Sequence, residues 1–331
     1  MPVNESTAFL RRDIVRLVLA TLATGVAAPA PAQAYPSKLI RLLLPYGAGG
    51  IGDLTARIIT QKMSESMGQQ FVIENRPGAG GVQAFLGGLQ APADGYTLVM
   101  GGNGAAVSQS LFKSLPYNIL KDFVQVSTMT KFSLVLLVGS DSKFRSVADL
   151  LAYGKAHPGK LNFGTSSIGS TQHLSAELFK SVADLEAQVV PFKVAAALYT
   201  ALRAREIDLA FEFLPAVVSQ VRSGTVRALA IAANKRDPSL PDVPTTAEGG
   251  LRGYEVVSWN AVSIRSETPP AIVDRLNKEF VAAISSPEVG QKLRAINAEP
   301  YPLTSAQARE LMASEIARWR AVIERAGIPR N

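Results

Sequence analysis

Short apolar runs alternate along this chain with longer segments in which apolar residues recur at helical spacing. Beyond residue 35 the pattern predicts a strand at 41–44, a helix at 53–67, a strand at 71–74, a helix at 82–89 and a strand at 97–100. This strand–helix order is typical of a parallel sheet with helices on both faces.

The alternation continues after an irregular segment around Pro116-Tyr117 and two short strands at 124–127 and 134–138. Helices are predicted at 147–156, 172–182, 195–203 and 216–223, and strands at 161–164, 188–191, 209–213, 228–232 and 256–264. Three final helices begin at Pro270, Pro287 and Ser305. The fold class is therefore α/β, with two units of similar design.

The first unit begins with a glycine-rich turn between an apolar strand and a helix. We call it the first loop; its candidate binding residues are Tyr46, Gly47, Ala48, Gly49, Gly50, Gly52 and Asp53. Glycines let the backbone turn tightly and approach a ligand closely. Asp53 is predicted as the helix N-cap. A strand followed by a tight turn and a helix N-terminus directs free N–H groups and the positive end of the helix dipole toward an anion.

The second unit has a comparable stretch, the second loop, at 165–171. It offers hydroxyls and backbone N–H groups at the start of a helix, and its candidate residues are Thr165, Ser166, Gly169, Ser170, Thr171 and His173. Plain N-capping by Ser170 or Thr171 and a structural role for His173 are the alternatives. Because ligands of such sheets bind at the carboxyl ends of the strands, two facing loops would suit a small dicarboxylate.

Composition narrows the function classes. The chain has 331 residues, of which 47% are hydrophobic and 18% charged, so it can bury a large core. The net charge is +7, but Lys and Arg are scattered without a run of four, which favours a solvated surface over a nucleic-acid footprint. There is no cysteine, which excludes disulfides, thiol nucleophiles and sulfur-ligated metals.

The N-terminus predicts export. Arg11, Arg12 and Arg16 precede a short apolar stretch at 17–28, and Ala32-Gln33-Ala34 forms a small-x-small cleavage site. We expect a signal peptide at 1–34, cleaved after Ala34, and a periplasmic location. An uncleaved N-terminal helix is the alternative, and export by the general or the twin-arginine route stays open. No later stretch has the length and apolarity of a membrane helix.

Two enzyme-like patterns need separate consideration. Gly47, Gly49 and Gly52 fit the dinucleotide fingerprint GxGxxG, and Glu74 follows where a ribose-binding acid belongs. Pro45-Tyr46 before the first glycine, Asp53 beside the helix N-terminus and the export signal argue against a dinucleotide. A structural turn without a ligand is the other alternative.

A secreted hydrolase would use Ser166 or Ser170 with His173, but residues 164–168 lack the last glycine of GxSxG. No His-rich spacing such as HExxH supports a metal, so neither a catalytic residue nor a metal nor a cofactor is expected. Glu212, at the end of a predicted strand, either meets a ligand amine or hydroxyl or caps the next helix. Tyr46 and Trp259 are candidates for an apolar wall or lid. Core packing is the alternative for both, and it is favoured for Trp259.

Ordered motifs along the whole mature chain resemble one receptor family. They include Tyr35-Pro36-Ser37-Lys38, Pro45-Tyr46-x-x-Gly49-Gly50-x-x-Asp53-x-x-Ala56-Arg57, Glu74-Asn75-Arg76-Pro77-Gly78-Ala79-Gly80-Gly81, Gly169-Ser170-x-x-His173-Leu174 and Leu240-Pro241-Asp242-Val243-Pro244-Thr245. The chain resembles the extracytoplasmic solute receptors of the tripartite tricarboxylate transporter system, the Bug receptors.

The resemblance implies a two-lobed type II periplasmic binding protein. Lobe one would comprise 35–137 plus 259–331 and lobe two 138–258, with crossings near Val138 and Val257. A solute carboxylate would be held, partly through waters, by the first and second loops. The receptor would be a monomer that delivers its solute to membrane permease subunits and binds no nucleic acid; a sensory co-receptor is the alternative.

Residues 212–216 and 191–196 depart from the family pattern. The family often has Asp-Asn-x-Pro-Ser where this chain has Glu212-Phe213-Leu214-Pro215-Ala216, and a Gly-Ser or Gly-Thr turn where it has Val194-Ala195-Ala196. These differences leave the identity of the solute open.

Overall fold

The computed structural model describes residues 35–166 and 168–330, and the predicted signal peptide at 1–34 lies outside them. From Lys38 onward the chain forms one compact unit. Among the described residues no helix has the length and apolarity needed to cross a membrane.

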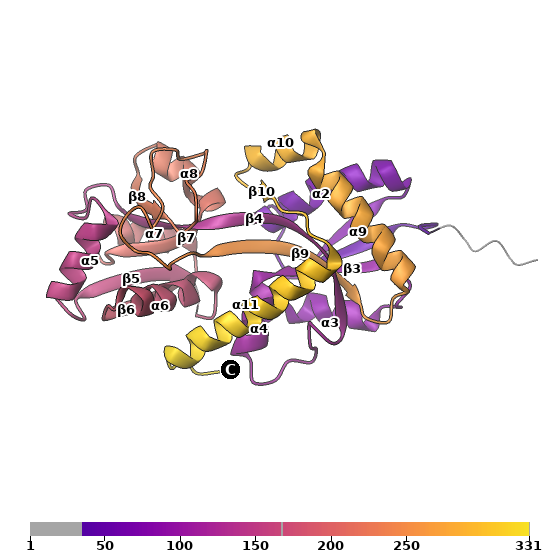
Figure 1. Ribbon diagram of the computed structural model, residues 1–331, viewed down its shortest axis with the longest axis horizontal. Coiled ribbons are helices and arrows are strands. Elements are labelled where there is room, and N and C mark those ends of the chain that lie inside the picture. Colours follow the sequence, from indigo (N-terminus) through magenta and orange to yellow (C-terminus); the bar gives the residue numbers. More distant parts are fainter. Residues whose placement is uncertain (1–34, 167, 331) are drawn as a thin grey trace, which may run out of the picture. The chain divides into compact units, whose positions relative to one another are not determined.

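Helices and strands alternate through this unit (Figure 1). The first half of the chain contains β1 (Ile40–Leu44), α2 (Ile51–Met67), β2 (Phe71–Asn75), η1 (Ala79–Gly81), α3 (Val82–Gln90), β3 (Thr97–Gly102), α4 (Asn103–Leu111), β4 (Phe123–Gly139) and α5 (Val147–Ala156). The second half contains β5 (Leu161–Ser166), α6 (Thr171–Ala183), β6 (Ala187–Phe192), α7 (Ala195–Arg203), β7 (Leu209–Phe213), α8 (Leu214–Arg222), β8 (Val226–Ile231), β9 (Val257–Arg265), α9 (Pro270–Ser285), α10 (Pro287–Ala295), β10 (Glu299–Pro300) and α11 (Ser305–Arg325).

The strands form one sheet in the order β2-β1-β3-β9-β4-β7-β5-β6, with β8 and β10 also paired to β4. β1 is parallel to β2 and β3, and β5 is parallel to β6 and β7, which confirms the two predicted parallel units. β9 runs antiparallel to both β3 and β4 and so joins the two units through the middle of the sheet.

β4 is a single strand of 17 residues, so the prediction of two short strands was wrong. Its first part pairs with β9 as far as Ser133, and from Leu134 it pairs with β7 and β8. The polar residues in its middle suggested a break. Ser127, Thr128 and Thr130 are buried instead, and the hydroxyls of Ser127 and Thr128 donate to the backbone oxygens of Leu303 and Tyr301.

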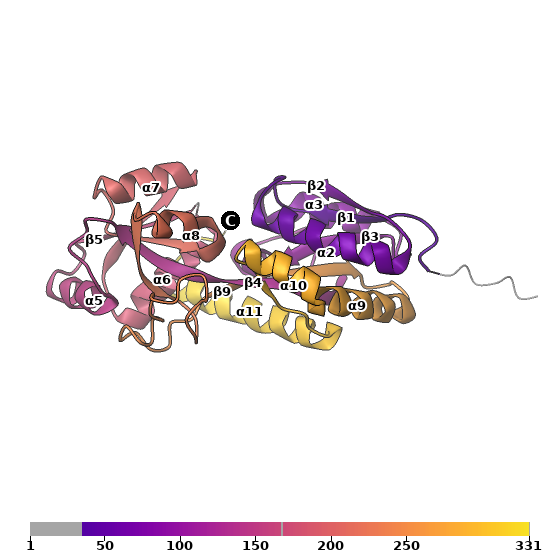
Figure 2. The same ribbon diagram turned by 90° about the horizontal axis from the view of Figure 1, so that it is seen from above.

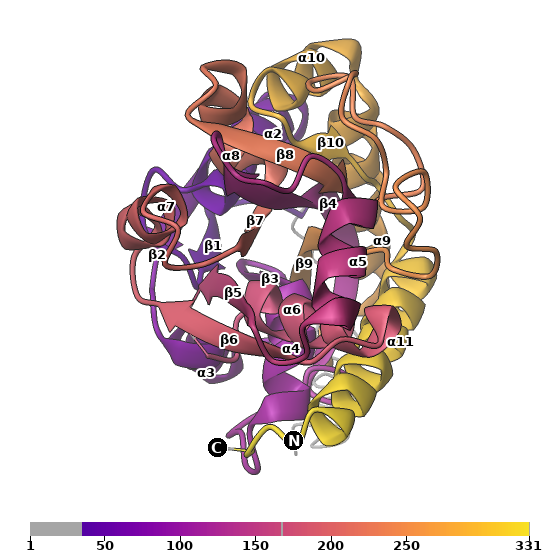
Figure 3. The same ribbon diagram turned by 90° about the vertical axis from the view of Figure 1, so that its left-hand side faces the viewer.

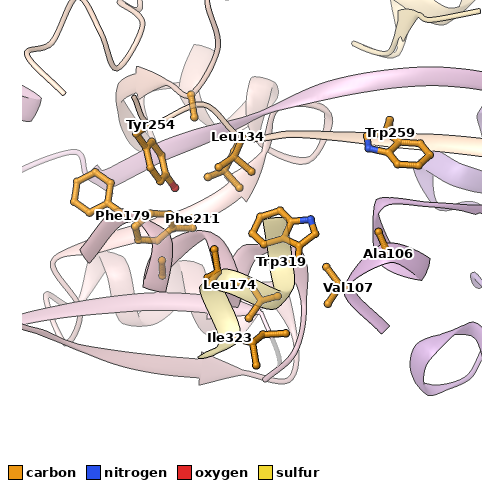
Figure 4. Close-up of a cluster of buried hydrophobic side chains, with 14 of the residues drawn as sticks. Ala106, Val107, Leu134, Leu174, Phe179, Phe211, Tyr254, Trp259, Trp319 and Ile323 are labelled. Carbon is orange, nitrogen blue, oxygen red and sulfur yellow. The ribbon is translucent and has the colours of Figure 1, made fainter. Parts of the chain in front are cut away.

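α4 was not predicted, because its opening Gly-Gly-Asn-Gly is typical of a turn. Tertiary packing supplies the stability that this sequence lacks: α11 packs along α4, and the hydroxyl of Ser110 donates to the backbone oxygen of Ile316 at 2.8 Å. Figure 4 shows Trp319 of α11 beside Ala106 and Val107 of α4, within a cluster that also contains Leu174, Phe179 and Tyr254.

The helices flank the two halves of the sheet separately, except for α11. Figure 2 shows α7 and α8 on the side of β5, and α2, α9 and α10 on the side of β1–β3; α7 contacts β5, β6 and β7, and α8 contacts β7. Figure 3 shows α11 next to α4 and α6, and it contacts both of these helices and β4. The C-terminal helix therefore packs on elements from both parallel units.

Candidate functional site

The first loop leads from β1 into α2. The helix begins at Ile51 with Gly50 as N-cap, so the prediction that Asp53 caps it was wrong. Gly49 has a φ of 79°, a left-handed conformation that favours glycine. Residues 47–50 are exposed, and the first N–H groups of an α-helix have no partner within the helix. The loop therefore presents backbone donors to solvent.

Asp53 holds this loop against the helix. Its buried carboxylate accepts hydrogen bonds from the Gly49 N–H at 3.0 Å, Asn75 Nδ2 at 3.0 Å and Arg57 Nε at 2.9 Å. Hydrogen bonding by Arg57, above all, lowers the pKa of Asp53 to about 2. A carboxylate engaged in this way shapes the loop and stays charged at neutral pH.

Asn75 was missed as a site residue. Its Nδ2 donates both to Asp53 and to the backbone oxygen of Tyr46, in each case at 3.0 Å. It lies at the carboxyl end of β2, opposite Leu44 at the end of β1. That position beside the first loop was a signal the sequence carried.

Tyr46 lies between two helix N-termini. A Cβ placed on Gly52 of α2 would be 2.7 Å from Tyr46 Cδ2, and one on Gly104 of α4 would be 3.9 Å from the Tyr46 hydroxyl. Burial of the phenol raises the pKa of Tyr46 to about 12. The ring is thus a neutral wall between the first turns of α2 and α4.

The second loop joins β5 to α6. Gly169 has a φ of 79°, and a Cβ there would lie 2.3 Å from Leu111 Cδ2 at the end of α4. Ser170 caps α6 by accepting a hydrogen bond from the His173 N–H, which confirms the predicted alternative of N-capping by Ser170. Thr171 Oγ accepts from Asn103 Nδ2 of α4 at 3.0 Å. The loop is therefore in direct contact with α4.

Two further residues of this part of the chain, Thr165 and His173, are buried. Thr165 is buried and its hydroxyl donates to the backbone oxygen of Ser166. In the described part of the chain, Nδ1 of His173 has no hydrogen-bond partner, and burial lowers the pKa of this imidazole. Ser170 Oγ bonds the His173 backbone rather than its imidazole, so these contacts do not form the serine–histidine pair of a hydrolase.

A cavity of about 290 Å³ brings parts of both loops together. Its lining comprises Pro45, Tyr46, Gly78, Gly80, Gly81, Phe85, Gly101, Gly104, Ala105, Val107, Ser108, Gly169, Ser170 and Thr171. Of the sequence-predicted site residues, Tyr46, Gly169, Ser170 and Thr171 line it. Gly47, Ala48, Gly49, Gly50, Gly52, Asp53, Thr165, Ser166, His173 and Glu212 are outside its lining.

The N-terminal turn of α4, which the sequence analysis missed, forms one wall of this cavity. Among the residues that the structure describes, no lysine or arginine lines it. Hydroxyls and the N-terminal turns of α4 and α6 are therefore the groups available to an anion, and they are neutral donors aided by helix dipoles.

Glu212 is buried at the end of β7. Its Oε1 accepts hydrogen bonds from the Phe213 N–H and from Gln172 Nε2, both at 2.8 Å. α8 has Phe213 as N-cap and no side-chain cap, so Glu212 links β7 to α6 rather than capping the next helix. Burial raises the pKa of Glu212.

The residues that suggested a dinucleotide site have other partners. Glu74 Oε1 accepts from Arg41 Nε at 2.6 Å, and Glu74 Oε2 accepts from Arg76 Nη2 at 2.9 Å.

Trp259 is buried in the core, as favoured from the sequence. Within residues 35–166 and 168–330, no group of three or more His, Cys, Asp and Glu side chains is arranged to hold a metal ion.

A sheet with parallel strands in two units, and an anion-suited cavity between their loops, is the arrangement of a solute-binding protein. Residues 55–328 match the sequence profile of the Tripartite tricarboxylate transporter family receptor. Protein BugT of Bordetella pertussis is 35% identical over 316 residues, covering 95% of this chain and 96% of BugT.

Two solved structures extend the comparison. Rpa4515 of R. palustris, solved with adipate, is 36% identical with a TM-score of 0.78, covering 89% of this chain and 99% of its own. MatC (Rpa3494) from Rhodopseudomonas palustris, with bound malate, is 31% identical with a TM-score of 0.73, covering 87% of this chain and all of its own.

The chain belongs to the tripartite tricarboxylate transporter receptor family. Members of this family are periplasmic solute receptors that work with tripartite transporters, and they are binding proteins rather than enzymes.

Proposed function

We propose that this receptor binds a small carboxylate in the cavity between Tyr46 and residues 169–171 and delivers it to membrane permease subunits. The observation that carries the proposal is the convergence of the N-terminal turns of α4 and α6 on one cavity of about 290 Å³, with Tyr46 between α4 and α2. Helix N-termini stabilise a carboxylate without a cationic side chain. Adipate and malate, found with the two related structures, are solutes of this class.

The predicted site residues then fall into two groups with different roles. Tyr46, Gly169, Ser170 and Thr171 line the cavity and would contact the solute. The other predicted site residues within 47–53 and 165–173 do not line the cavity. They would shape the loops or contact the solute once the receptor closes. Glu212 would hold the second unit's strand edge to α6, beside the part of the site that distinguishes one solute from another.

Closure would occur between two lobes, 35–137 with 259–331 and 138–258. β4 changes its pairing partner after Ser133, and the chain returns into β9 at Val257. Both observations support β4 and β9 as the strands that cross between the lobes and act as flexible links. A solute that contacts both loops favours the closed state because only that state makes all of its contacts. The mature receptor would be a monomer, released by cleavage after Ala34.

Isothermal titration calorimetry of the purified mature chain tests this function. The ligands are adipate, malate, citrate, benzoate and glutamate, with adipamide as an uncharged control of the same length as adipate. We expect at least one acid to bind and adipamide to give no heat, because the amide lacks the charge that the helix N-termini stabilise. Absence of binding for every acid, or equal binding of adipate and adipamide, would contradict the proposal.

A further inference from the structure

Three buried side chains from distant parts of the chain form a hydrogen-bonded series beside the cavity. Trp319 Nε1 of α11 donates to Asn103 Oδ1 of α4 at 2.9 Å, and Asn103 Nδ2 donates to Thr171 Oγ of α6 at 3.0 Å. Trp319 and Asn103 are fully buried, and Thr171 is 8% exposed. Thr171 alone of the three lines the cavity. The series therefore runs from the core to the wall of the proposed binding site.

The chemistry of tryptophan fixes the direction of this series. An indole N–H donates and cannot accept, so the atom of Asn103 that faces it must be the carbonyl oxygen. The amide N–H of Asn103 is then directed at Thr171, whose oxygen must accept. A hydroxyl has a single proton, and none of the hydrogen bonds found for the described residues uses this one. The Thr171 proton is consequently available to an acceptor in the cavity.

We propose that Trp319 and Asn103 are positioning residues that orient the Thr171 hydroxyl to donate its proton to the solute carboxylate. The inference rests on the proposed function, because it requires a carboxylate in this cavity. It also explains how a cavity with no lysine or arginine among its described lining residues obtains a directed donor. Trp319 of α11, acting through Asn103 of α4, orients the Thr171 proton toward the solute. Hydrogen bonds in such a series strengthen one another in a low-dielectric surrounding.

Removal of the indole N–H has a specific consequence. In Trp319→Phe the Asn103 amide is free to rotate by half a turn, so that its oxygen faces Thr171. The Thr171 proton would then be donated to Asn103 instead of the solute. Asn103→Asp enforces the same outcome, because both carboxylate oxygens accept hydrogen bonds, and it adds a negative charge near the bound anion.

The chain contains a matched control for Trp319→Phe. Its other tryptophan, Trp259, is also buried, but its Nε1 has no hydrogen-bond partner among the described residues. Trp259→Phe therefore removes a similar volume and an indole N–H that orients nothing. It also leaves Trp319 as the only tryptophan, so its fluorescence reports the surroundings of the series.

Calorimetry with adipate, and in parallel with malate, tests the proposal on the mature chain. A hydrogen bond to a charged group predicts that Thr171→Val weakens binding about 10- to 100-fold, whereas Thr171→Ser, which keeps the hydroxyl, stays within about threefold of wild type. Trp319→Phe should weaken binding about three- to tenfold and Trp259→Phe should leave it unchanged. Thermal unfolding of each variant verifies that the protein remains folded at the titration temperature.

A double variant separates positioning from general stability. If Trp319 acts through Thr171, Trp319→Phe causes no further loss of affinity when it is added to Thr171→Val. An additive loss, or unchanged affinity in Thr171→Val, overturns the inference and leaves the proposed function intact. If the wild-type chain binds neither acid nor any other of the panel, the proposed function itself fails and the inference falls with it.

Discussion

Asp53→Asn is the sharpest test of how the first loop is built. The substitution keeps the size of the side chain but removes the charge that accepts from Arg57, Asn75 and the Gly49 N–H. The new amide group also places a donor against these donors. We expect a less stable protein with a loosened loop and weaker solute binding.

The magnitude follows from the pKa of Asp53, which falls from 3.8 to about 2 in the folded protein. A difference of this size corresponds to roughly 2 kcal/mol in favour of the charged form. The Arg57 side chain is 53% exposed, so solvent screening reduces its share, and about 1 kcal/mol is a conservative value for the charge. Unsatisfied donors add about 1 kcal/mol, which gives a loss of about 1–3 kcal/mol at pH 7.

The pH dependence provides the second readout. Because the pKa of Asp53 is lowered on folding, its contribution is fully present above pH 3.8 and is lost as the pH falls toward 2. Urea unfolding monitored by circular dichroism should therefore show the two proteins becoming closer in stability between pH 4 and pH 2.

Glu65→Gln is the matched control, since Glu65 is an exposed carboxylate on the same helix that pairs with Lys62 at 2.9 Å. It should change the free energy of unfolding by less than about 0.5 kcal/mol. Equal stability of Asp53→Asn and wild type at pH 7, or a difference that persists unchanged at pH 2, would show that the Asp53 charge does not stabilise the folded protein.

Two further predictions concern Gly52, which is packed against Tyr46, and Glu212, which lies outside the cavity lining. Gly52→Ala gains about 1 kcal/mol of helix propensity, but its new Cβ would lie 2.7 Å from Tyr46 Cδ2 and displace the ring at a cost of about 1–3 kcal/mol. Calorimetry should therefore show weaker solute binding by Gly52→Ala. Gln61→Ala, an exposed position on the same helix, is the control and should leave binding unchanged. Glu212→Gln keeps the oxygen that accepts both hydrogen bonds and removes a buried charge. Because burial raises the pKa of Glu212, wild type loses stability relative to this variant as the pH rises above 4.5. Thermal unfolding should show that the variant is more stable than wild type by roughly 1 kcal/mol at pH 7 and equally stable at pH 4. A variant that is less stable than wild type at pH 7 would contradict the assignment of Glu212 as a destabilising buried charge.

Local patterns in the sequence were sufficient to predict the two parallel units and both loops. A strand followed by glycines and a helix has the same physical meaning wherever it occurs, because the free N–H groups and the dipole belong to the backbone. Tyr46 and residues 169–171, chosen on that basis, line one cavity in the structure.

Other features depended on partners far away in the chain. The polar middle of β4 pairs with the segment before α11, and the weak helical sequence of α4 is stabilised by α11 itself. Asp is a residue type that is favoured as an N-cap, which is why Asp53 was predicted as one. In the structure Asp53 lies in the first turn of α2, where its carboxylate accepts hydrogen bonds from Arg57 and Asn75. Sequence periodicity shows which face of an element is apolar, but not which element covers it.

The α/β class, the two predicted loops and the resemblance to one receptor family could be predicted from the chain alone, because these depend on short motifs in order. Which of those residues line the cavity, and how the Thr171 hydroxyl is oriented, depends instead on contacts between distant segments of the folded chain. Asn103 and Trp319 are 216 positions apart, and a hydrogen bond across that distance leaves no local pattern in the chain. Its direction follows from one indole N–H that becomes a neighbour of Asn103 only when α11 packs on α4.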